Sequence, residues 1–455
     1  MTADYAEFIA AKQYTHLDAG FEAWNLPECL RDFQADIVGW ACRRGRAAIF
    51  ADTGLGKTLM QLVWAAQVEQ HTNGAVLVVA PLCVAQQTVG EGKKFGIDCK
   101  YMREPQFSNA RIHVTNYEML KNFNPEDYAG IVLDESSILK GMDGKLRKSI
   151  TEFASTIPYR LSCTATPSPN DFMELGTQSE FLGIMSQVEM LATFFIHDGS
   201  DTSKWRLKGH GRARFWEWLA TWAAVVRHPR DLGYEADGYD LPELIYHEHI
   251  VETGINDGLF AKIAQGLQER NQARRESINL RVEKAAEIAN SVEGACIVWC
   301  HLNDESAMLE SQIDGGVQVY GSMTPDKKEE LIAGFTDGEI DKLITKPRIA
   351  GFGLNWQHCN HVVFTGLSDS WESFYQAVRR CWRFGQTMPV HVHIISADTE
   401  GAVLENIRRK QAQHDQVSEE MAKVMKDYTV AEIKGASIEK ADYVAVEDMR
   451  VPAWL

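Results

Sequence analysis

Residues 51–58 read Ala-Asp-Thr-Gly-Leu-Gly-Lys-Thr, and their types and spacing can bind a phosphate chain. The stretch satisfies the phosphate-loop pattern with one relaxation, because Ala51 stands where the strict form has glycine. The two glycines let the backbone approach phosphates closely, Lys57 can neutralise the β- and γ-phosphates, and the Thr58 hydroxyl can ligate Mg²⁺. The stretch therefore predicts a site for a nucleotide with Mg²⁺, formed by Thr53, Gly54, Leu55, Gly56, Lys57 and Thr58.

Two adjacent carboxylates, Asp134 and Glu135, directly follow the apolar run 131–133. Parallel α/β sheets bind their ligands at the carboxyl ends of strands, so an acidic pair at this point predicts a catalytic role. Asp134 can hold Mg²⁺, and Glu135 can orient and deprotonate an attacking water. The alternative is an ordinary acidic pair in a loop, which is less common directly after an apolar strand.

A third group of candidates lies in residues 376–386, which read Gln-Ala-Val-Arg-Arg-Cys-Trp-Arg-Phe-Gly-Gln. Gln376, Arg380 and Arg383 are spaced four and three apart, so they share a face if the segment is helical. Arginines that reach a γ-phosphate from another lobe stabilise the charge that develops in the transition state. Taken alone, such a run more often forms a solvated face or a phosphate-contacting face.

Alternating apolar strands and helices must position these groups. The run 47–50 predicts a buried strand before the phosphate loop, and residues 59–70 predict a helix after it. Further strands are expected at 75–80, 111–115, 131–133 and from residue 159 onward. A second set is expected at 296–300, 317–320, 342–345, 361–364 and 390–395, with helices at 325–335 and 370–383. This alternation predicts parallel sheets covered on both faces, and hence an α/β fold.

Residues 190–245 have a different composition. Their middle part is basic, with Lys204, Arg206 and Lys208 in close succession, and tryptophans follow at positions 216, 218 and 222. One reading is an insertion that faces nucleic acid, with basic groups for phosphates and rings for stacking. The other is a small helical subdomain with a tryptophan core. We favour a division in which the tryptophans lie mostly in the core and the basic residues lie mostly on the surface.

The composition sets outer bounds on the class of protein. The chain has 455 residues, of which 45% are hydrophobic and 24% charged, and this is ordinary for a globular protein. No apolar run is long enough to span a bilayer, and nine cysteines without a CxxC pair favour free thiols in a reducing cytoplasm. The net charge of −17 does not exclude nucleic acid, because binding needs only a local basic face. The histidine pairs lack the companion ligands of a zinc site, so no metal other than Mg²⁺ is expected.

In this order, the motifs resemble those of superfamily 2 nucleic-acid motors, most closely the Swi/Snf-type branch and the compact DEAD/DEAH-box helicases of phages and prophages. The resemblance covers about residues 25–400, and segment 376–386 is similar to the family pattern Q-A-I-G-R-A-H-R-I-G-Q. It implies two tandem RecA-like lobes of the P-loop NTPase class with a small helical insertion between them. It also implies hydrolysis of ATP with Mg²⁺ in the cleft between the lobes.

The resemblance also implies roles for individual residues. Gln34, within the segment 30–34, would read the adenine edge, and Gly353 and Gln376 would contact the nucleotide. The catalytic residues would be Lys57, Asp134, Glu135, and the arginine fingers Arg380 and Arg383. Nucleic-acid contacts would come from family motifs and from the basic segment, namely Pro81, Asn116, Tyr117, Thr164, Thr166, Asn355, Lys204, Arg206 and Lys208.

Three features depart from the family pattern. Ser137 stands where the family usually has histidine, so coupling between the nucleotide and the segment 164–166 is expected to differ. Arg379 replaces a glycine and adds positive charge near the lobe interface. Segment 190–245 is short where remodelling enzymes carry long insertions, which fits a minimal motor.

The expected function is an ATP-dependent DNA helicase or translocase, a DNA-dependent ATP hydrolase. One alternative is a duplex DNA translocase that remodels or anneals without separating strands, since no wedge element is identifiable. Another is a protein whose nucleotide state acts only as a switch on a partner, which the intact Glu135, Arg380 and Arg383 argue against. A metabolic phosphate-loop kinase fits less well, because it would not need a second lobe that bears arginines.

The chain is expected to divide into an N-terminal extension (1–24), a first lobe (25–190), the insertion and linker (191–245), a second lobe (246–400) and a C-terminal helix with an acidic tail (401–455). The expected partner is single- or double-stranded DNA rather than RNA, with no membrane and room for a protein partner. A cytoplasmic monomer is favoured, in a bacterial host cell if the chain is phage-encoded.

Overall fold

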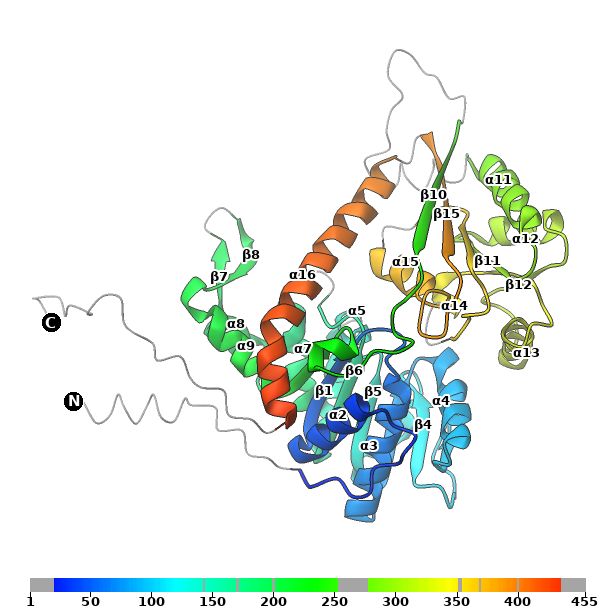
Figure 1. The fold of residues 1–455 in the computed structure, drawn as a ribbon. Helices are drawn as coiled ribbons and strands as arrows, with labels where there is room; N and C mark the ends of the chain where they lie inside the picture. The colour runs from blue at the N-terminus through cyan, green and yellow to red at the C-terminus, as the bar shows by residue number, and fades with distance from the viewer. Residues whose placement is uncertain are drawn as a thin grey trace, which may run out of the picture.

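The computed structural model describes residues 20–141, 144–168, 172–198, 201–252, 277–350, 354–367, 370–398 and 401–434. They form two parallel β-sheets, each packed between helices, and a separate two-stranded ribbon (Figure 1). We call the part around the first sheet the first lobe and the part around the second sheet the second lobe. This architecture confirms the predicted α/β fold of two tandem RecA-like lobes. In the described ranges, no helix is both long enough and apolar enough to cross a membrane.

The first lobe is built on a seven-stranded sheet in the order β3-β4-β2-β5-β6-β1-β9. All of its neighbouring strands run parallel. The strands are β1 (Arg46–Ala51), β2 (Ala75–Ala80), β3 (Cys99–Tyr101), β4 (Ile112–Asn116), β5 (Tyr128–Asp134), β6 (Tyr159–Thr164) and β9 (Ala223–Val226). The helices are α2 (Asp32–Arg44), α3 (Lys57–Thr72), α4 (Leu82–Lys94), α5 (Ile138–Gly141), α6 (Gly144–Ser155), α7 (Leu175–Leu182), α8 (Gln187–Phe194) and α9 (Arg212–Ala220).

The two faces of this sheet bury alternate residues of the same strands. In β1, Ala47 and Ile49 pack into one core with α2 and α3, whereas Ala48 and Phe50 pack into the other core with α7 and α9. A strand that is buried on both faces reads as a continuous apolar run, which is why the sequence pattern identified it. The carboxyl ends of β1, β5 and β6 consequently meet along one edge of the sheet.

The second lobe has a six-stranded parallel sheet in the order β10-β15-β14-β11-β13-β12. Its strands are β10 (Leu244–Val251), β11 (Cys296–Trp299), β12 (Gly316–Val319), β13 (Lys342–Thr345), β14 (His361–Phe364) and β15 (Val390–Ala397). Its helices are α11 (Ile278–Ser291), α12 (Asn303–Gln312), α13 (Pro325–Thr336), α14 (Pro347–Ala350) and α15 (Trp371–Val378). The five strands expected from the sequence in this half are all present.

A single long helix, α16 (Gly401–Lys434), runs from the second lobe back to the first (Figure 1). Near its start, Val403 and Ile407 are buried in the core of the second lobe. Near its end, Met421 and Met425 are buried in the core of the first lobe, and Ile433 reaches the core on the opposite face of that sheet. The helix therefore connects the two lobes through buried side chains at both ends.

The first sheet extends further along the chain than residue 190, where we expected the first lobe to end. β9 lies in the segment expected to form the insertion, yet it pairs with β1 from Ala48↔Ala223 to Ala51↔Val226. Its four residues Ala-Ala-Val-Val are too few to give a strand signal beside the preceding tryptophans. The segment also contains an antiparallel ribbon of β7 (Phe195–Asp198) and β8 (Asp201–Leu207), so it is not purely helical.

Candidate functional site

The phosphate loop connects β1 to α3, as the sequence predicts. Gly54 and Gly56 adopt φ values of +88° and +79°, in the region that side-chain-bearing residues rarely occupy. The Lys57 ammonium donates to the carbonyl oxygens of Ala51 at 2.8 Å and Asp52 at 3.2 Å, so it lies within the loop that it would serve. Burial lowers the pKa of Lys57, an effect that the charge of Glu135 opposes.

Asp134 is the last residue of β5, and Glu135 directly follows it. Strand β6 lies between β5 and β1, the strand that leads into the phosphate loop. Gln61 of α3 donates its side-chain amide to Asp134 Oδ1 at 2.7 Å. Glu135 adopts φ = +52°, an unusual conformation for this residue type that tends to occur at functional sites. Its Oε2 is buried and, within the described ranges, has no hydrogen-bond partner. Burial raises the pKa of both carboxyls, against the attraction of Lys57 and Arg380.

The arginines of the second lobe follow α15 instead of lying on it. The prediction of a helix to residue 383 is wrong, because α15 ends at Val378 and the chain continues in tight turns. In those turns the Arg380 amide donates to the Ala377 carbonyl at 3.3 Å, and the Cys381 amide donates to the Val378 carbonyl at 3.1 Å. The common helical face expected for Gln376, Arg380 and Arg383 is therefore absent.

Backbone carbonyls hold the two arginines together instead. Arg380 donates through Nε to the Gln376 carbonyl at 2.9 Å, and through Nη1 to the Leu354 carbonyl at 3.4 Å. Arg383 donates to the same Leu354 carbonyl at 3.1 Å. Burial, followed by the neighbouring Arg380, lowers the pKa of Arg383 to about 9. A buried guanidinium, Arg380, and a partly buried one, Arg383, so close together form a site that favours an anion.

A cleft with an internal space of about 240 Å³ joins these groups from both lobes. From the first lobe, its lining includes the predicted residues Gln34, Thr53, Gly54, Gly56, Lys57, Thr58, Asp134 and Glu135. From the second lobe, it includes Asn355, Arg380 and Arg383. Leu55 does not line it, but its carbonyl accepts the Gln34 side-chain amide at 2.9 Å. Gln376 is buried and does not line the cleft, and Gly353 lies outside the described residues.

One part of the cleft was not predicted from the sequence. The rings of Tyr239 and Phe384 lie 4.6 Å apart, and the Arg31 guanidinium lies 5.4 Å and 5.7 Å from their respective centroids. Phe384 packs so closely on the phosphate loop that a Cβ on Gly54 would come within 2.8 Å of its amide nitrogen. These three residues come from distant segments without a shared motif, so no sequence signal linked them.

The residues predicted to contact nucleic acid do not form one exposed surface. Asn116, Tyr117, Thr164 and Thr166 are at most 3% exposed, and Pro81 is buried at the start of α4. The Tyr117 hydroxyl donates to the Asp134 carbonyl at 2.8 Å, and the Asn116 side chain is hydrogen-bonded to Tyr101 and Met119. The side chains at these positions are packed inside the first lobe. In this conformation, any contact with nucleic acid there would have to come from backbone atoms.

The basic segment contributes less than its composition suggests. Lys208 donates to the carbonyl oxygens of Ala192 at 2.7 Å and Thr193 at 2.9 Å, so it caps the end of α8. Arg206 is exposed on β8, and the Lys204 side chain lies outside the described residues. Trp216, Trp218 and Trp222 are all buried, which confirms the expected tryptophan core.

Two family models match the chain over the parts that form the cleft. Residues 31–175 match the DEAD/DEAH box helicase family, and residues 281–385 match the helicase conserved C-terminal domain. The first range contains the phosphate loop and the acidic pair, and the second contains the two arginines.

Two proteins of known name share sequence with the chain. The TATA-binding protein-associated factor MOT1 of Saccharomyces cerevisiae is 28% identical over 186 residues, which cover 34% of this chain and 10% of that protein. The putative ATP-dependent helicase/translocase YwqA of Bacillus subtilis is 27% identical over 478 residues, which cover 87% of this chain and 50% of that protein. The chain thus spans half or less of each of these relatives. The predicted likeness to phage helicases stays a prediction.

Among solved structures, the SWI2/SNF2 ATPase core of Sulfolobus solfataricus in complex with double-stranded DNA aligns with a TM-score of 0.42 at 19% identity. That alignment covers 92% of this chain and 99% of the other. The two matched domains occur in the order that the cleft requires, with one contributing each wall. The chain therefore carries a DEAD/DEAH box helicase domain followed by a helicase C-terminal domain.

Proposed function

We propose that the chain is a DNA-stimulated ATPase that uses hydrolysis between its lobes to move along DNA. The observation that carries the proposal is the shared cleft, which brings Lys57 and Glu135 of one lobe to Arg380 and Arg383 of the other. A site divided between two lobes makes nucleotide occupancy dependent on their separation, and this is how hydrolysis can drive a stepwise motion.

The donor groups of the cleft fit ATP with Mg²⁺. Thr58 and Asp134 would hold the ion, since hydroxyl and carboxylate oxygens suit a hard cation. When bound, Mg²⁺ neutralises charge on the β- and γ-phosphates. Lys57 would bind the same phosphates, and Gln34 would face the adenine from the position that its bond to Leu55 fixes. Tyr239 and Phe384 supply an aromatic wall against which the base can pack.

In the hydrolytic step, water attacks the γ-phosphorus and the bond to the β–γ bridging oxygen breaks. Glu135 would accept the proton of the attacking water through its unpartnered Oε2. Its raised pKa, caused by burial, makes it a stronger base than an exposed glutamate. Arg380 and Arg383 would stabilise the charge that grows on the transferred group, from a water-poor site where such stabilisation is strong.

The kind of movement is the finer part of the proposal. YwqA is named as a putative helicase/translocase, and its match extends over 87% of this chain. We can assign no strand-separating wedge from the sequence, so translocation on duplex DNA is the version we favour over unwinding.

Steady-state ATPase rates at low salt test this proposal. The rate would be measured without nucleic acid, and then with single-stranded DNA, duplex DNA and RNA. We expect the largest stimulation with duplex DNA, and its loss as salt rises, because phosphate contacts are salt-sensitive. If only single-stranded DNA stimulated the rate, we would conclude that the chain moves along one strand and not along the duplex. A slow rate that none of the three changes would refute the motor and favour a nucleotide switch that acts on a partner.

A further inference from the structure

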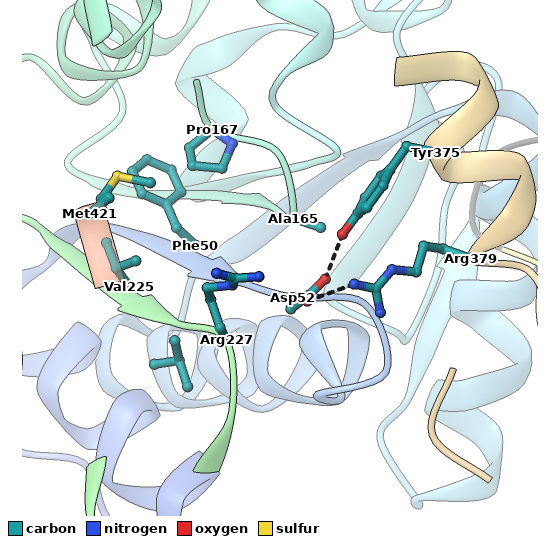
Figure 2. A pocket seen from close by; sticks show the side chains of 10 residues that line it. Phe50, Asp52, Ala165, Pro167, Val225, Arg227, Tyr375, Arg379 and Met421 are labelled. Carbon is teal, nitrogen blue, oxygen red and sulfur yellow. Dashed lines mark hydrogen bonds and ion pairs between the residues drawn. The ribbon is translucent and has the colours of Figure 1, made fainter. Parts of the chain in front are cut away.

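One carboxylate of the phosphate loop is bound by side chains from the other lobe. Arg379 donates through Nη2 to Asp52 Oδ2 at 3.1 Å, and the Tyr375 hydroxyl donates to Asp52 Oδ1 at 3.0 Å (Figure 2). The Thr53 amide donates to Oδ1 from within the loop at 2.6 Å. Asp52 therefore joins the backbone of the phosphate loop directly to α15 and its last turn.

A second contact holds the other end of the same helix. The Thr166 hydroxyl, which follows β6 of the first lobe, donates to Glu372 Oε1 at 3.2 Å. Glu372 lies in the first turn of α15, Tyr375 lies in its middle, and Arg379 caps its C-terminal end. Because both ends are attached to the first lobe, the direction of α15 relative to the phosphate loop is fixed.

The surroundings of the Asp52–Arg379 pair strengthen it. Only 15% of the Asp52 side chain and 9% of the Arg379 side chain are exposed. They border a cavity of about 30 Å³ whose other walls include Phe50, Pro167 and Met421. Burial by itself would raise the pKa of Asp52, but Arg379, Thr53, Lys57 and Tyr375 outweigh it and lower that pKa, so both partners are charged at neutral pH. Removal of one partner would leave a buried charge without compensation, and this is strongly unfavourable.

These three side chains lie beside the nucleotide cleft without lining it. The described residues around the 240 Å³ space include Thr53, Arg380 and Arg383, but not Asp52, Tyr375 or Arg379. Arg379 directly precedes Arg380 in the chain, and Asp52 directly precedes Thr53. The pair can therefore act on hydrolysis only through its neighbours.

We propose that Asp52, Tyr375 and Arg379 form an inter-lobe clasp that positions Arg380 and Arg383 against the phosphate loop for hydrolysis. The three are positioning residues, since their polar atoms bind one another and not the nucleotide. The inference rests on the proposed ATPase function and adds to it a contact that determines how fast the closed site reacts. A glycine at position 379, as in the family pattern, could not form this contact.

The test is a double-mutant cycle on the full chain, with kcat and KM for ATP measured for Asp52→Asn, Arg379→Gln and the double variant. We expect each single variant to lower kcat about tenfold and to change KM less than about twofold, because misplacement of a catalytic group acts mainly on the chemical step. The double variant is expected to be no slower than either single variant, since each change already breaks the clasp. Tyr375→Phe should reduce kcat by only about two- to threefold, because it removes one hydrogen bond to Asp52 and leaves the ion pair with Arg379 in place.

Two further variants separate positioning from a loss of folding. Arg379→Lys keeps the charge and should recover part of kcat, whereas a general packing defect would not respond to the charge. Arg230→Gln breaks an Arg–Asp pair with Asp240 whose two side chains are 62% and 66% exposed, and it should leave kcat and KM unchanged. Thermal unfolding of all variants is recorded beside the kinetics.

The outcomes distinguish failure of the clasp from failure of the proposed function. If the wild type hydrolyses ATP and the clasp variants match it, or if the two single effects multiply in the double variant, the clasp is refuted and the ATPase stands. A change confined to KM would also refute it, because it would assign these residues to nucleotide binding. A wild type without ATPase activity would refute the proposed function and the clasp with it.

Discussion

In the first lobe the reactive groups directly follow central strands, whereas in the second lobe they follow a short helix and a series of turns. Asp134 ends β5, and the phosphate loop leaves β1, so the position of both is set by a sheet that is buried on both faces. Arg380 and Arg383 instead lie outside any helix or strand. Their side chains are held by hydrogen bonds to the backbone carbonyls of Gln376 and Leu354.

This difference suggests a division of labour. Under the proposed function, the first lobe would supply the phosphate-binding groups and the general base from elements of a single sheet. The second lobe would add positive charge whose position depends on α15, and α15 is attached to the first lobe at Asp52 and Thr166. Substitutions in the first lobe should therefore remove chemistry itself, and those in the second should affect the approach to it.

The largest effect is expected from Glu135→Gln, which keeps the shape of the side chain and removes the base. We expect kcat to fall about 1,000-fold, within the range that general bases contribute. ATP binding should persist, because Lys57 and the loop glycines are untouched, and a fluorescent ATP analogue would measure it. Turnover near the wild-type rate would show that Glu135 is not the base.

The matched change in the second lobe is Arg380→Gln. It should lower kcat about 100-fold, less than the roughly 1,000-fold or more of a lone arginine finger because Arg383 remains, and it should leave ATP binding largely intact, because a transition-state arginine contributes little to the ground state. If Arg380→Gln weakened ATP binding as strongly as it slowed turnover, the arginine would belong to the binding site, and the division between the lobes would be incorrect.

Much of the first lobe's site could be predicted because its signals are local. The phosphate loop, the acidic pair and the apolar strands each occupy a few consecutive residues, and both faces of the sheet are covered, so their apolar runs are unbroken. The end of α15 at Val378 was not predicted, because residues 379–383 carry no glycine or proline that would mark a helix end, and the change to i→i−3 bonds at Arg380 and Cys381 is visible only in the structure.

Contacts between distant segments left no signal in the sequence. Asp52 and Arg379 are 327 positions apart, and nothing in either motif indicates that they pair. The burial of Asn116 and Tyr117 likewise depends on tertiary partners, Tyr101 and the Asp134 carbonyl. The helix at the C-terminus could be predicted from composition, but its return to the first lobe could not.

Because α16 packs against both lobes, substitutions in this helix allow the stability of the two lobes to be compared. Met425 of α16 is fully buried in the core of the first lobe, and Ile407 of the same helix is 2% exposed in the core of the second. Met425→Ala should destabilise the first lobe by about 3 kcal/mol, as expected for a buried methionine truncated to alanine. Hydrogen exchange should then show faster exchange in β9 and little change in β14, and Ile407→Ala should show the reverse.

Val188→Ala serves as the control, because Val188 is 76% exposed and its truncation should not change exchange in either sheet. Equal acceleration of β9 and β14 in both core variants would mean that the lobes unfold as one cooperative unit through α16. The lobes would then differ in chemistry but not in stability.

The smallest expected effect concerns a stack of histidines that lies only in the second lobe. His247 and His249 of β10 lie beside His391 and His393 of β15, with nitrogen–nitrogen distances of 2.9 Å for His247–His391 and 3.1 Å for His249–His393. His361 of β14 stacks on His391 at a centroid distance of 5.0 Å. Burial, and then the neighbouring histidines, lower the pKa of His393 to about 4.

Because the folded state lowers this pKa below the unfolded value near 6.5, the stabilisation is complete above pH 6.5 and is lost as the pH falls from 6.5 toward 4. His393 is only partly buried, so solvent weakens the effect and we expect a loss of only about 1 kcal/mol by pH 5. Denaturant unfolding of the wild type and of His393→Gln at pH 7.5 and pH 5 measures it. The variant lacks the His393 imidazole, so it should lose less stability on acidification than the wild type. Contributions from the first lobe are the same in both proteins and cancel in the difference between them. An equal loss in both would mean that the stack tolerates protonation and that acid sensitivity arises elsewhere, most directly at Asp52 of the first lobe, whose pKa the folded state lowers.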